Sequence, residues 1–313
     1  TFKARNKGLA SLRAVRIGAP YIKLDGLKID KYSGVGGNTW GAGVRVEIVG
    51  SGSVITNCTI SDLPHVIAHD ISFVNSASPV IVSPSSNFIS AGFKVGSKIY
   101  LGASGLNHVT AGPLYYANHD TTWTVSAVTA TTLTLTAGSA AWITDTGTNY
   151  WAFIRAGTGN SGYPAIYTVQ AGGIGPSEVI ISNNVITNWP AHAIDLSGDG
   201  HLVEGNTLTN LKSFRFMHFN GSNHTFRRNL IKDCPNVLHY SPDETEDLDH
   251  PIGTGWYDYQ AGMLSGFTDP GIPNNANVVV EENWFQNIEN QLGRVDDELP
   301  GAYNIVYRNN VFV

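Results

Sequence analysis

Side chains that carry charge or exchange protons occur at comparable places in the second half of the chain. The five that stand out are Asp195, Arg215, His218, His239 and Arg294. An arginine can neutralise the carboxylate of an acidic sugar, and a histidine can remove the proton next to that carboxylate. A lyase that acts on uronic-acid polymers needs both. In such a lyase Arg215 or Arg294 would be the neutralising cation, and a histidine of the set would be the base.

Paired carboxylates would instead indicate a hydrolase, because glycoside hydrolysis needs two of them flanking the scissile bond. Asp195 with Asp258 meets this need, and so does Asp199 with an acidic residue of the segment 241–277. The separation of the two carboxyl groups decides whether the anomeric configuration is inverted or retained. Lys212 is a further candidate base for the lyase, so the residues alone leave both mechanisms open.

The segment 241–277 combines acidic and aromatic residues, as sugar-binding clefts do. Aromatic rings pack on the apolar faces of sugars, and carboxylates or amides bind their hydroxyls. The residues that we expect to contact substrate are Lys212, Tyr240, His250, Trp256, Tyr257, Tyr259 and Gln260. The chemistry requires no cofactor, but oxygen ligands for Ca²⁺ are available. They are Asp243, Glu244, Asp247 and Asp249. The alternative for this segment is a solvated acidic loop.

A nine-residue phrase must position these side chains. It reads apolar, two free positions, Asn or a small substitute, any residue, apolar, any residue, Asn or Asp, apolar. Copies begin at Leu24, Ile55, Ile181, Val203, Phe226 and Val280, and Tyr307 begins a partial copy. The sixth position falls at Ile186, Leu208 and Ile231, which are 22 and 23 residues apart. Periods of this length indicate stacked supersecondary units.

Each copy predicts two short strands with a turn between them, because apolar and polar residues alternate with period 2. A period of about 22 residues is too short for a strand–helix–strand unit, which needs about 30. We therefore predict a parallel β-helix in which Asn184, Asn206 and Asn229 lie in single file and bond to one another across coils. Coils stack about 4.8 Å apart, so the charged residues after each phrase become one outward strip. By the same count His69 and Asp70 belong to the early coil of that strip.

The period breaks between Ile60 and Ile186, which are 126 residues apart. Strands rich in Thr and Val are expected there at 93–101, 121–128 and 131–136, the last two joined as a hairpin. We predict an inserted antiparallel β subdomain at 73–156, with the β-helix formed by 1–72 and 157–313. Removing roughly 80 residues leaves about two coils of solenoid in this interval. A second excursion separates Ile231 from Phe285.

Some polar residues are better explained by structure. His201 and His224 stand two residues before the first apolar residue of successive copies, so we expect stacked structural histidines. Cys58 fills an Asn position and Cys234 an apolar one, which predicts two small, buried, unpaired residues.

Composition narrows the functional class. The net charge is −6, charged residues make up 14%, and no Lys/Arg-rich run occurs, which argues against nucleic-acid binding. No apolar stretch of about 18 residues predicts a membrane span. The sequence shows no signal peptide, although Thr1 is not a natural start.

The I-x-x-N-x-I/F phrase resembles the right-handed parallel β-helix repeat of the pectate-lyase-like superfamily. Gly92–Gly96 and Trp123–Leu133 together resemble a small β module of phage tail and virion proteins. The resemblances imply an all-β, right-handed parallel β-helix with an inserted β subdomain. They also imply an extracellular, secreted or virion-associated protein that binds and degrades a polysaccharide in the manner of a tailspike, assembled as a homotrimer. The alternatives are a non-catalytic structural or adhesive virion component and a secreted bacterial glycosidase.

Overall fold

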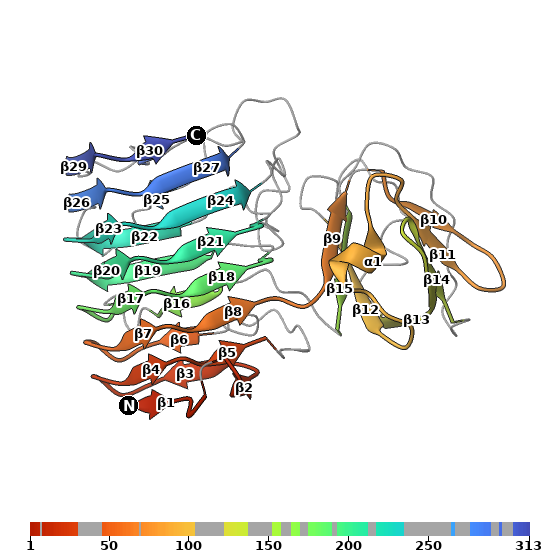
Figure 1. The fold of residues 1–313 in the computed structure, drawn as a ribbon, viewed down its shortest axis with the longest axis horizontal. Coiled ribbons are helices and arrows are strands. Elements are labelled where there is room, and N and C mark those ends of the chain that lie inside the picture. The colour runs from red at the N-terminus through yellow and green to blue at the C-terminus, as the bar shows by residue number, and fades with distance from the viewer. Residues whose placement is uncertain are drawn as a thin grey trace.

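The computed structural model describes residues 1–6, 8–30, 46–68, 70–103, 122–136, 152–157, 164–169, 175–189, 193–211, 217–234, 264–266, 276–288, 294–295 and 303–313. Its main body is a right-handed parallel β-helix, which confirms the predicted fold class. Successive coils rise from the N-terminal to the C-terminal end, and a smaller antiparallel sheet projects from its side (Figure 1). No helix in the described part is long and apolar enough to cross a membrane.

Each coil contributes a strand to each of three parallel strips. Strip one contains β1 (Phe2–Lys3), β4 (Lys23–Asp25), β7 (Val54–Thr56), β17 (Ile180–Ser182), β20 (Leu202–Glu204), β23 (Thr225–Arg227), β26 (Ala276–Glu281) and β29 (Tyr303–Arg308). Strip two contains β2 (Ser11–Leu12), β5 (Lys28–Ile29), β8 (Thr59–Ser61), β18 (Val185–Thr187), β21 (Thr207–Thr209), β24 (Leu230–Cys234), β27 (Trp284–Ile288) and β30 (Val311–Phe312).

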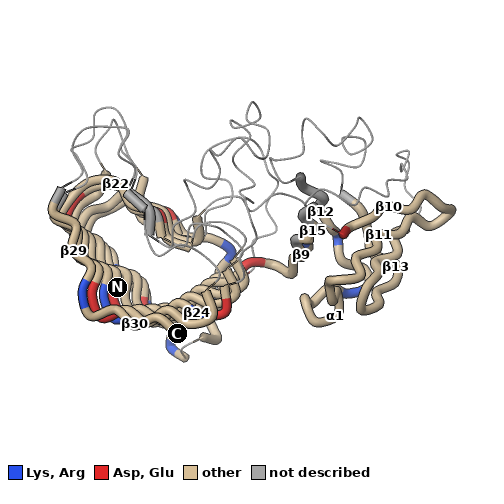
Figure 2. The backbone as a smooth tube through the Cα atoms, turned by 90° about the horizontal axis from the view of Figure 1, so that it is seen from above, with Lys and Arg blue, Asp and Glu red and all other residues tan. Residues whose placement is uncertain are grey.

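Strip three lies in the chain between a strip-two strand and the strip-one strand of the next coil. It contains β3 (Val15–Ile17), β6 (Val46–Ile48), β16 (Ile166–Thr168), β19 (Ile194–Asp199), β22 (Met217–Ser222), β25 (Leu264–Gly266) and β28 (Arg294–Val295). Strips one and three join where Ser222 of β22 pairs with Ala276 of β26, so the described strands of both form one 15-stranded sheet. Viewed from above, the coils superpose around a common axis (Figure 2).

The phrase corresponds to a strip-one strand, a tight turn and a strip-two strand. Its third position, not its Asn, takes the left-handed conformation: φ is 55° at Asn183, 65° at Gly205 and 54° at Arg228. The fixed asparagines Asn184, Asn206 and Asn229 are not left-handed. The residue before it bends the chain, and the Asn itself has a hydrogen-bonding role.

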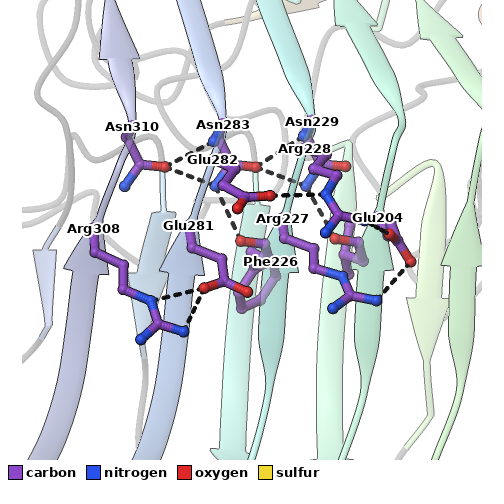
Figure 3. A network of polar contacts seen from close by, with 11 residues as sticks. Glu204, Phe226, Arg227, Arg228, Asn229, Glu281, Glu282, Asn283, Arg308 and Asn310 are labelled. Atoms are coloured by element: carbon purple, nitrogen blue, oxygen red, sulfur yellow. Dashed lines mark hydrogen bonds and ion pairs between the residues drawn. The ribbon is translucent and has the colours of Figure 1, made fainter.

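The fixed asparagines form a buried ladder along the axis, as predicted (Figure 3). The Asn206 side chain accepts bonds from the backbone and side-chain nitrogens of Asn184, both at 3.0 Å. Its own Nδ2 donates to the Ile181 carbonyl at 2.9 Å and to Oδ1 of Asn229 at 3.0 Å. The pattern continues through later coils, so each buried amide is satisfied by its neighbours. Every coil is thereby locked in register with the next.

A second ladder, made of charged residues, runs along the outside of the same corner, beside β29 (Figures 2 and 3). Arg228 bridges Glu204 and Glu282, with both contacts at 2.8 Å. Arg308 pairs with Glu281 at 2.6 Å. These pairs are solvated and link coils that the buried ladder already joins.

The core of the β-helix consists of the inward residues of the three strips. The column Ile55, Ile181, Val203 and Phe226 in strip one faces the column Ile60, Ile186, Leu208 and Ile231 in strip two, and all are fully buried. Burying one such side chain is worth about 1.5–3 kcal/mol. A one-residue slip would turn every one of them outward, so apolar burial and the asparagine ladder select the same register.

The inserted segment interrupts the chain but not the stack. Ile60 pairs directly with Ile186, and Ile55 with Ile181, so residues 126 positions apart lie on adjacent coils. The prediction of about two coils within this interval is therefore wrong. The whole excursion leaves after β8 and returns before β16.

The insertion is an antiparallel sheet in the order β10 (Ser72–Val74), β11 (Val80–Val82), β14 (Thr132–Leu135), β13 (Thr122–Val128), β12 (Lys98–Ala103), β15 (Ala152–Ala156) and β9 (His65–Ala68). The hairpin of β13 and β14 was predicted. The sheet begins at His65, earlier than the predicted boundary at residue 73. The strand expected from Phe93 begins at Lys98, because the short helix α1 (Phe88–Ala91) ends at Gly92 and a turn at Gly96 follows.

A buried ion pair fastens the insertion to the β-helix. Asp62, immediately after β8, accepts two bonds from Arg155 of β15, at 2.9 Å from Nε and 2.8 Å from the terminal nitrogen. Both side chains are fully buried. Cys58 and Cys234 are buried and form no disulfide with each other, as predicted. Cys58 takes the asparagine position, with its N–H donating to Asn184 at 2.9 Å, and burial raises the pKa of its thiol.

Candidate functional site

Asp195 is held outward on strip three by the alternation of β19. Its neighbours Ile194 and Leu196 are completely buried in the core, so the period of two turns Asp195 to the outer face. The same alternation holds for Glu47 between Val46 and Ile48. Both carboxylates are partly exposed.

Strand register aligns Asp195 with one residue from each of the other strip-three strands. We call this set the outer row, and in chain order it consists of Arg16, Glu47, Tyr167, Asp195, His218, Ser265 and Arg294. Adjacent strands lie about 4.8 Å apart, so the row extends about 29 Å along the axis. Its described side chains, those of Arg16, Glu47, Tyr167 and Asp195, bring a guanidinium group, two carboxylates and a phenol together from positions remote in sequence.

The N-terminal end of the row contains an ion pair. Arg16 Nε lies 3.5 Å from Glu47 Oε1, with the arginine side chain 68% exposed and the glutamate side chain 20% exposed. Tyr167 on the next coil is partly buried. Exposed pairs of this kind contribute little to stability, so Glu47 is not required by the fold.

Three of the predicted catalytic residues, Asp195, His218 and Arg294, occupy the outer row. Beyond His218 the row continues with Ser265 of β25. One expected position is wrong. Asp70 belongs to the inserted region, where it accepts bonds from Ser83 and Ser85, and not to the row.

The remaining predicted residues lie outside the described part of the chain. These are the catalytic candidates Arg215, His239 and Asp258, the substrate-binding candidates Lys212, Tyr240, His250, Trp256, Tyr257, Tyr259 and Gln260, the calcium candidates Asp243, Glu244, Asp247 and Asp249, and His69. Among the described residues, no group of three His, Cys, Asp or Glu could hold a metal ion.

Sequence reasoning missed Glu47, Tyr167 and Arg16, although a signal was present for Glu47 and Arg16. Counting backward from the next phrase, Glu47 precedes Ile55 by eight residues, and Asp195 precedes Val203 by eight. The link from strip three to strip one is therefore constant in these coils. The prediction counted forward from the preceding phrase instead. The links from strip two to strip three differ in length, so that count did not align the strip-three residues.

His201 and His224 form a buried stack at the corner between strips three and one, as predicted. Their ring centroids are 4.9 Å apart and the planes differ by 7°. Nδ1 of His201 accepts the Val179 N–H at 3.1 Å, so Nε2 carries the proton and donates to the Ser197 carbonyl at 3.0 Å. His224 repeats this pattern, with the His201 N–H at 3.3 Å and the Asn220 carbonyl at 3.2 Å.

Burial lowers the pKa of both stacked histidines. For His224 the pKa falls to about 3, with repulsion from His201 as the second cause. Both rings are therefore neutral near neutral pH, and both ring nitrogens of each have hydrogen-bond partners. The stack is structural and separate from the outer row.

Comparison with known proteins places the chain near phage tailspikes only at low similarity. No family model and no curated protein matches. The tailspike protein gp49 from Pseudomonas phage LKA1 is 11% identical, with a TM-score of 0.20, over 96% of this chain and 48% of its own. The tailspike gp61 of Pseudomonas phage phi297 is 10% identical, with a TM-score of 0.26, over 97% of this chain and 45% of its own.

A third structure is the Gp54 tailspike of Acinetobacter baumannii bacteriophage AP22 in complex with A. baumannii capsular saccharide. It is 10% identical, with a TM-score of 0.19, over 91% of this chain and 71% of its own. This chain spans about half the length of the first two tailspikes. At these TM-scores the likeness carries no argument about function, which must come from the outer row itself.

Proposed function

We propose that the outer row binds a polysaccharide laid along the β-helix axis and cleaves it. The observation that carries this proposal is the row itself: the outward residues Glu47, Tyr167 and Asp195 lie on three successive coils, and strand register continues the row through positions 218, 265 and 294. One sugar of an extended polysaccharide advances by about the spacing of one coil, which is about 4.8 Å. Successive sugars can therefore meet successive members of the row.

The rigidity of the support favours this use. Positioned acid–base groups act only when the scaffold holds them, and here each strand is fixed by two ladders of parallel neighbours and by the asparagine ladder. Asp195 occupies the middle of the row and has a partly buried carboxylate. Substitution of Asp195 is therefore the most direct test of cleavage.

The test is a panel containing polygalacturonate, alginate, dextran, xylan and purified bacterial capsular polysaccharides. Elimination gives a product with a new ultraviolet absorbance, whereas hydrolysis gives reducing ends without it. Asp195→Asn should lower the cleavage rate by about 10²–10⁴-fold while the substrate stays bound, if the carboxylate acts as acid or base.

Asp233→Asn is the matched control. It makes the same chemical change at a left-handed strip-two corner, where φ is 54°. Asn188, Asn210 and Asn287 take the same conformation at their corners, so asparagine suits this position. The control should cleave like the wild type. Failure of the wild-type protein to bind or cleave any member of the panel would overturn the proposed function.

A non-catalytic structural or adhesive shaft is the second candidate. It is favoured by the continuous buried ladder and by the exterior charge ladder, which stiffen the coils independently of any substrate. A shaft would bind no polysaccharide along the outer row, and Asp195→Asn would then change nothing measurable.

The setting that we propose is extracellular, either secreted or virion-associated, with the chain assembled as a homotrimer. Light scattering of the purified chain tests the trimer. Ca²⁺ at the acidic run of 243–249 stays a proposal, tested by the effect of a chelator on thermal stability. Membership of the pectate-lyase-like superfamily is likewise proposed on the repeat phrase.

A further inference from the structure

We propose that Glu47 is the second carboxylate of this site and acts with Asp195 to hydrolyse a glycosidic bond with inversion of the anomeric configuration. This inference rests on the proposed function, because it needs a sugar chain on the outer row. It adds the reaction type, the partner of Asp195 and the stereochemical outcome.

The two carboxylates stand on either side of one coil. Tyr167 pairs with Glu47 on the preceding strand and with Asp195 on the following strand. Two strand steps separate the backbones of the two acidic residues by about 9.6 Å. Both residues alternate with fully buried neighbours, so both belong to the outer face.

Arg16 is the charge partner of Glu47. Its Nε lies 3.5 Å from Glu47 Oε1, and it comes from the strand on the far side of Glu47 from Asp195. This arginine therefore does not lie between the two acidic residues.

The separation selects one of the two hydrolytic mechanisms. Retaining enzymes hold their carboxyl groups about 5–5.5 Å apart, and inverting enzymes about 6.5–9.5 Å apart, which leaves room for a water molecule. Carboxylates on adjacent coils, about 4.8 Å apart, would suit retention. The backbones of Glu47 and Asp195 are two coils apart, about 9.6 Å, which is too far for retention and lies at the upper end of the range for inversion.

The reaction follows from this placement. Glu47 removes a proton from water as the water oxygen forms a bond to the anomeric carbon. The bond between that carbon and the leaving oxygen breaks, and the leaving oxygen takes the proton of the Asp195 carboxylic acid. One water is consumed, two chain ends form, and the two carboxyl groups return to their starting states by exchanging one proton through solvent. Tyr167 lies on the coil between Glu47 and Asp195, where the reacting bond would be placed.

The experiment compares Glu47→Gln, Asp195→Asn and a control, Glu178→Gln, on the polysaccharide that the wild type degrades in the panel above. Glu178 is an exposed residue at the strip-one corner, outside the outer row. We expect Glu47→Gln to lower kcat by about 10²–10⁴-fold with binding retained within a few-fold, and Glu178→Gln to behave as wild type.

Stereochemistry is the second readout. Proton NMR during the first turnovers should show the new reducing end in the configuration opposite to that of the bond cleaved. For Glu47→Ala, azide should restore turnover and give a glycosyl azide of inverted configuration, because azide needs no base. Circular dichroism confirms that each variant is folded.

The outcomes separate this inference from the proposed function. Retention of configuration, or an active Glu47→Gln, overturns the role of Glu47 and leaves polysaccharide cleavage standing. A gain of ultraviolet absorbance shows elimination and overturns hydrolysis alone. A wild-type protein that is silent across the panel overturns the proposed function and this inference together.

Discussion

The buried pair His201 and His224 makes the stability of the β-helix sensitive to mild acid. The pKa of His224 is lowered by burial from its ordinary value of 6.5 to about 3. In the unfolded chain this imidazole takes up a proton below about pH 6.5, whereas in the folded chain it stays neutral until about pH 3. Lowering the pH therefore favours the unfolded state, and stability is lost as the pH falls below 6.5.

The size of the effect follows from the shift. One pKa unit corresponds to about 1.36 kcal/mol, so at pH 5, about 1.5 units below the unfolded pKa, His224 alone removes about 2 kcal/mol of unfolding free energy. Its depressed pKa limits the loss to about 4 kcal/mol near pH 3. His201, whose pKa is lowered by the same cause, acts in the same direction.

The perturbation is His224→Asn. The asparagine Oδ1 takes the place of Nδ1, so the His201 N–H keeps an acceptor while the titratable group is removed. The assay is urea unfolding at about pH 7.5 and about pH 5, followed by tryptophan fluorescence and circular dichroism. The wild type should lose at least about 2 kcal/mol more than the variant between the two pH values.

His201→Asn is the companion variant, because it likewise keeps an acceptor for the Val179 N–H. Equal acid sensitivity in the wild type and both variants would refute the reasoning, since carboxylates elsewhere would then account for all of it. A wild type equally stable at both pH values would refute it as well.

Three further predictions concern the scaffold. Asn206→Ala should destabilise the chain by about 2–4 kcal/mol in urea unfolding because it leaves buried ladder groups without partners. Asn210→Gly on the outer corner, where φ is 53°, removes only a part-buried side-chain bond and should change stability by less than about 1 kcal/mol. Gly198→Ala should prevent soluble expression, because its Cβ would lie 1.9 Å from a backbone oxygen at a φ of 124°, while Gly200→Ala, with its nearest contact at 3.7 Å, should fold with a lower melting temperature. Arg155→Met should destabilise by about 3–5 kcal/mol, measured by thermal unfolding, because it removes the bidentate arginine partner of a buried carboxylate, and a melting curve unchanged from wild type would contradict this account.

The sequence predicted those parts of the fold that repeat with constant spacing. Strip one, the turn and strip two follow from the phrase, and the ladder of Asn184, Asn206 and Asn229 follows from its fixed position. Strip three was harder to predict because the link before each of its strands varies in length. The strand at 264–266 was not predicted for this reason.

Glycines recur at the corner between strips three and one, and a search for apolar periodicity does not detect them. Gly198 pairs with Gly221 on the next coil, and a Cβ at either position would overlap backbone atoms of the coil before. The need for glycine arises from packing between coils, so it becomes visible only when the coils are aligned. The insertion was recognised from its change of texture. Its length was underestimated because β9 (His65–Ala68) carries no repeat signal.

The 126-residue separation of Cys58 and Asn184 has a consequence for the order in which the protein folds. Joining two ordinary neighbours closes a loop of 22 residues, as between Asn184 and Asn206. The longer closure, about 2.5 doublings, costs about 1.5 kcal/mol more in chain entropy. The antiparallel sheet removes most of this difference if it forms first, because the Ala156 N–H donates to the Pro64 carbonyl and shortens the effective loop by 92 residues, from 126 to 34.

Once formed, the inserted antiparallel sheet thus holds the coil that precedes it close to the coil that follows it. We expect amides of β12 (Lys98–Ala103) and β15 (Ala152–Ala156) to gain protection in pulse-labelled hydrogen exchange before those of β17 (Ile180–Ser182). The reverse order would show that the coils find each other unaided.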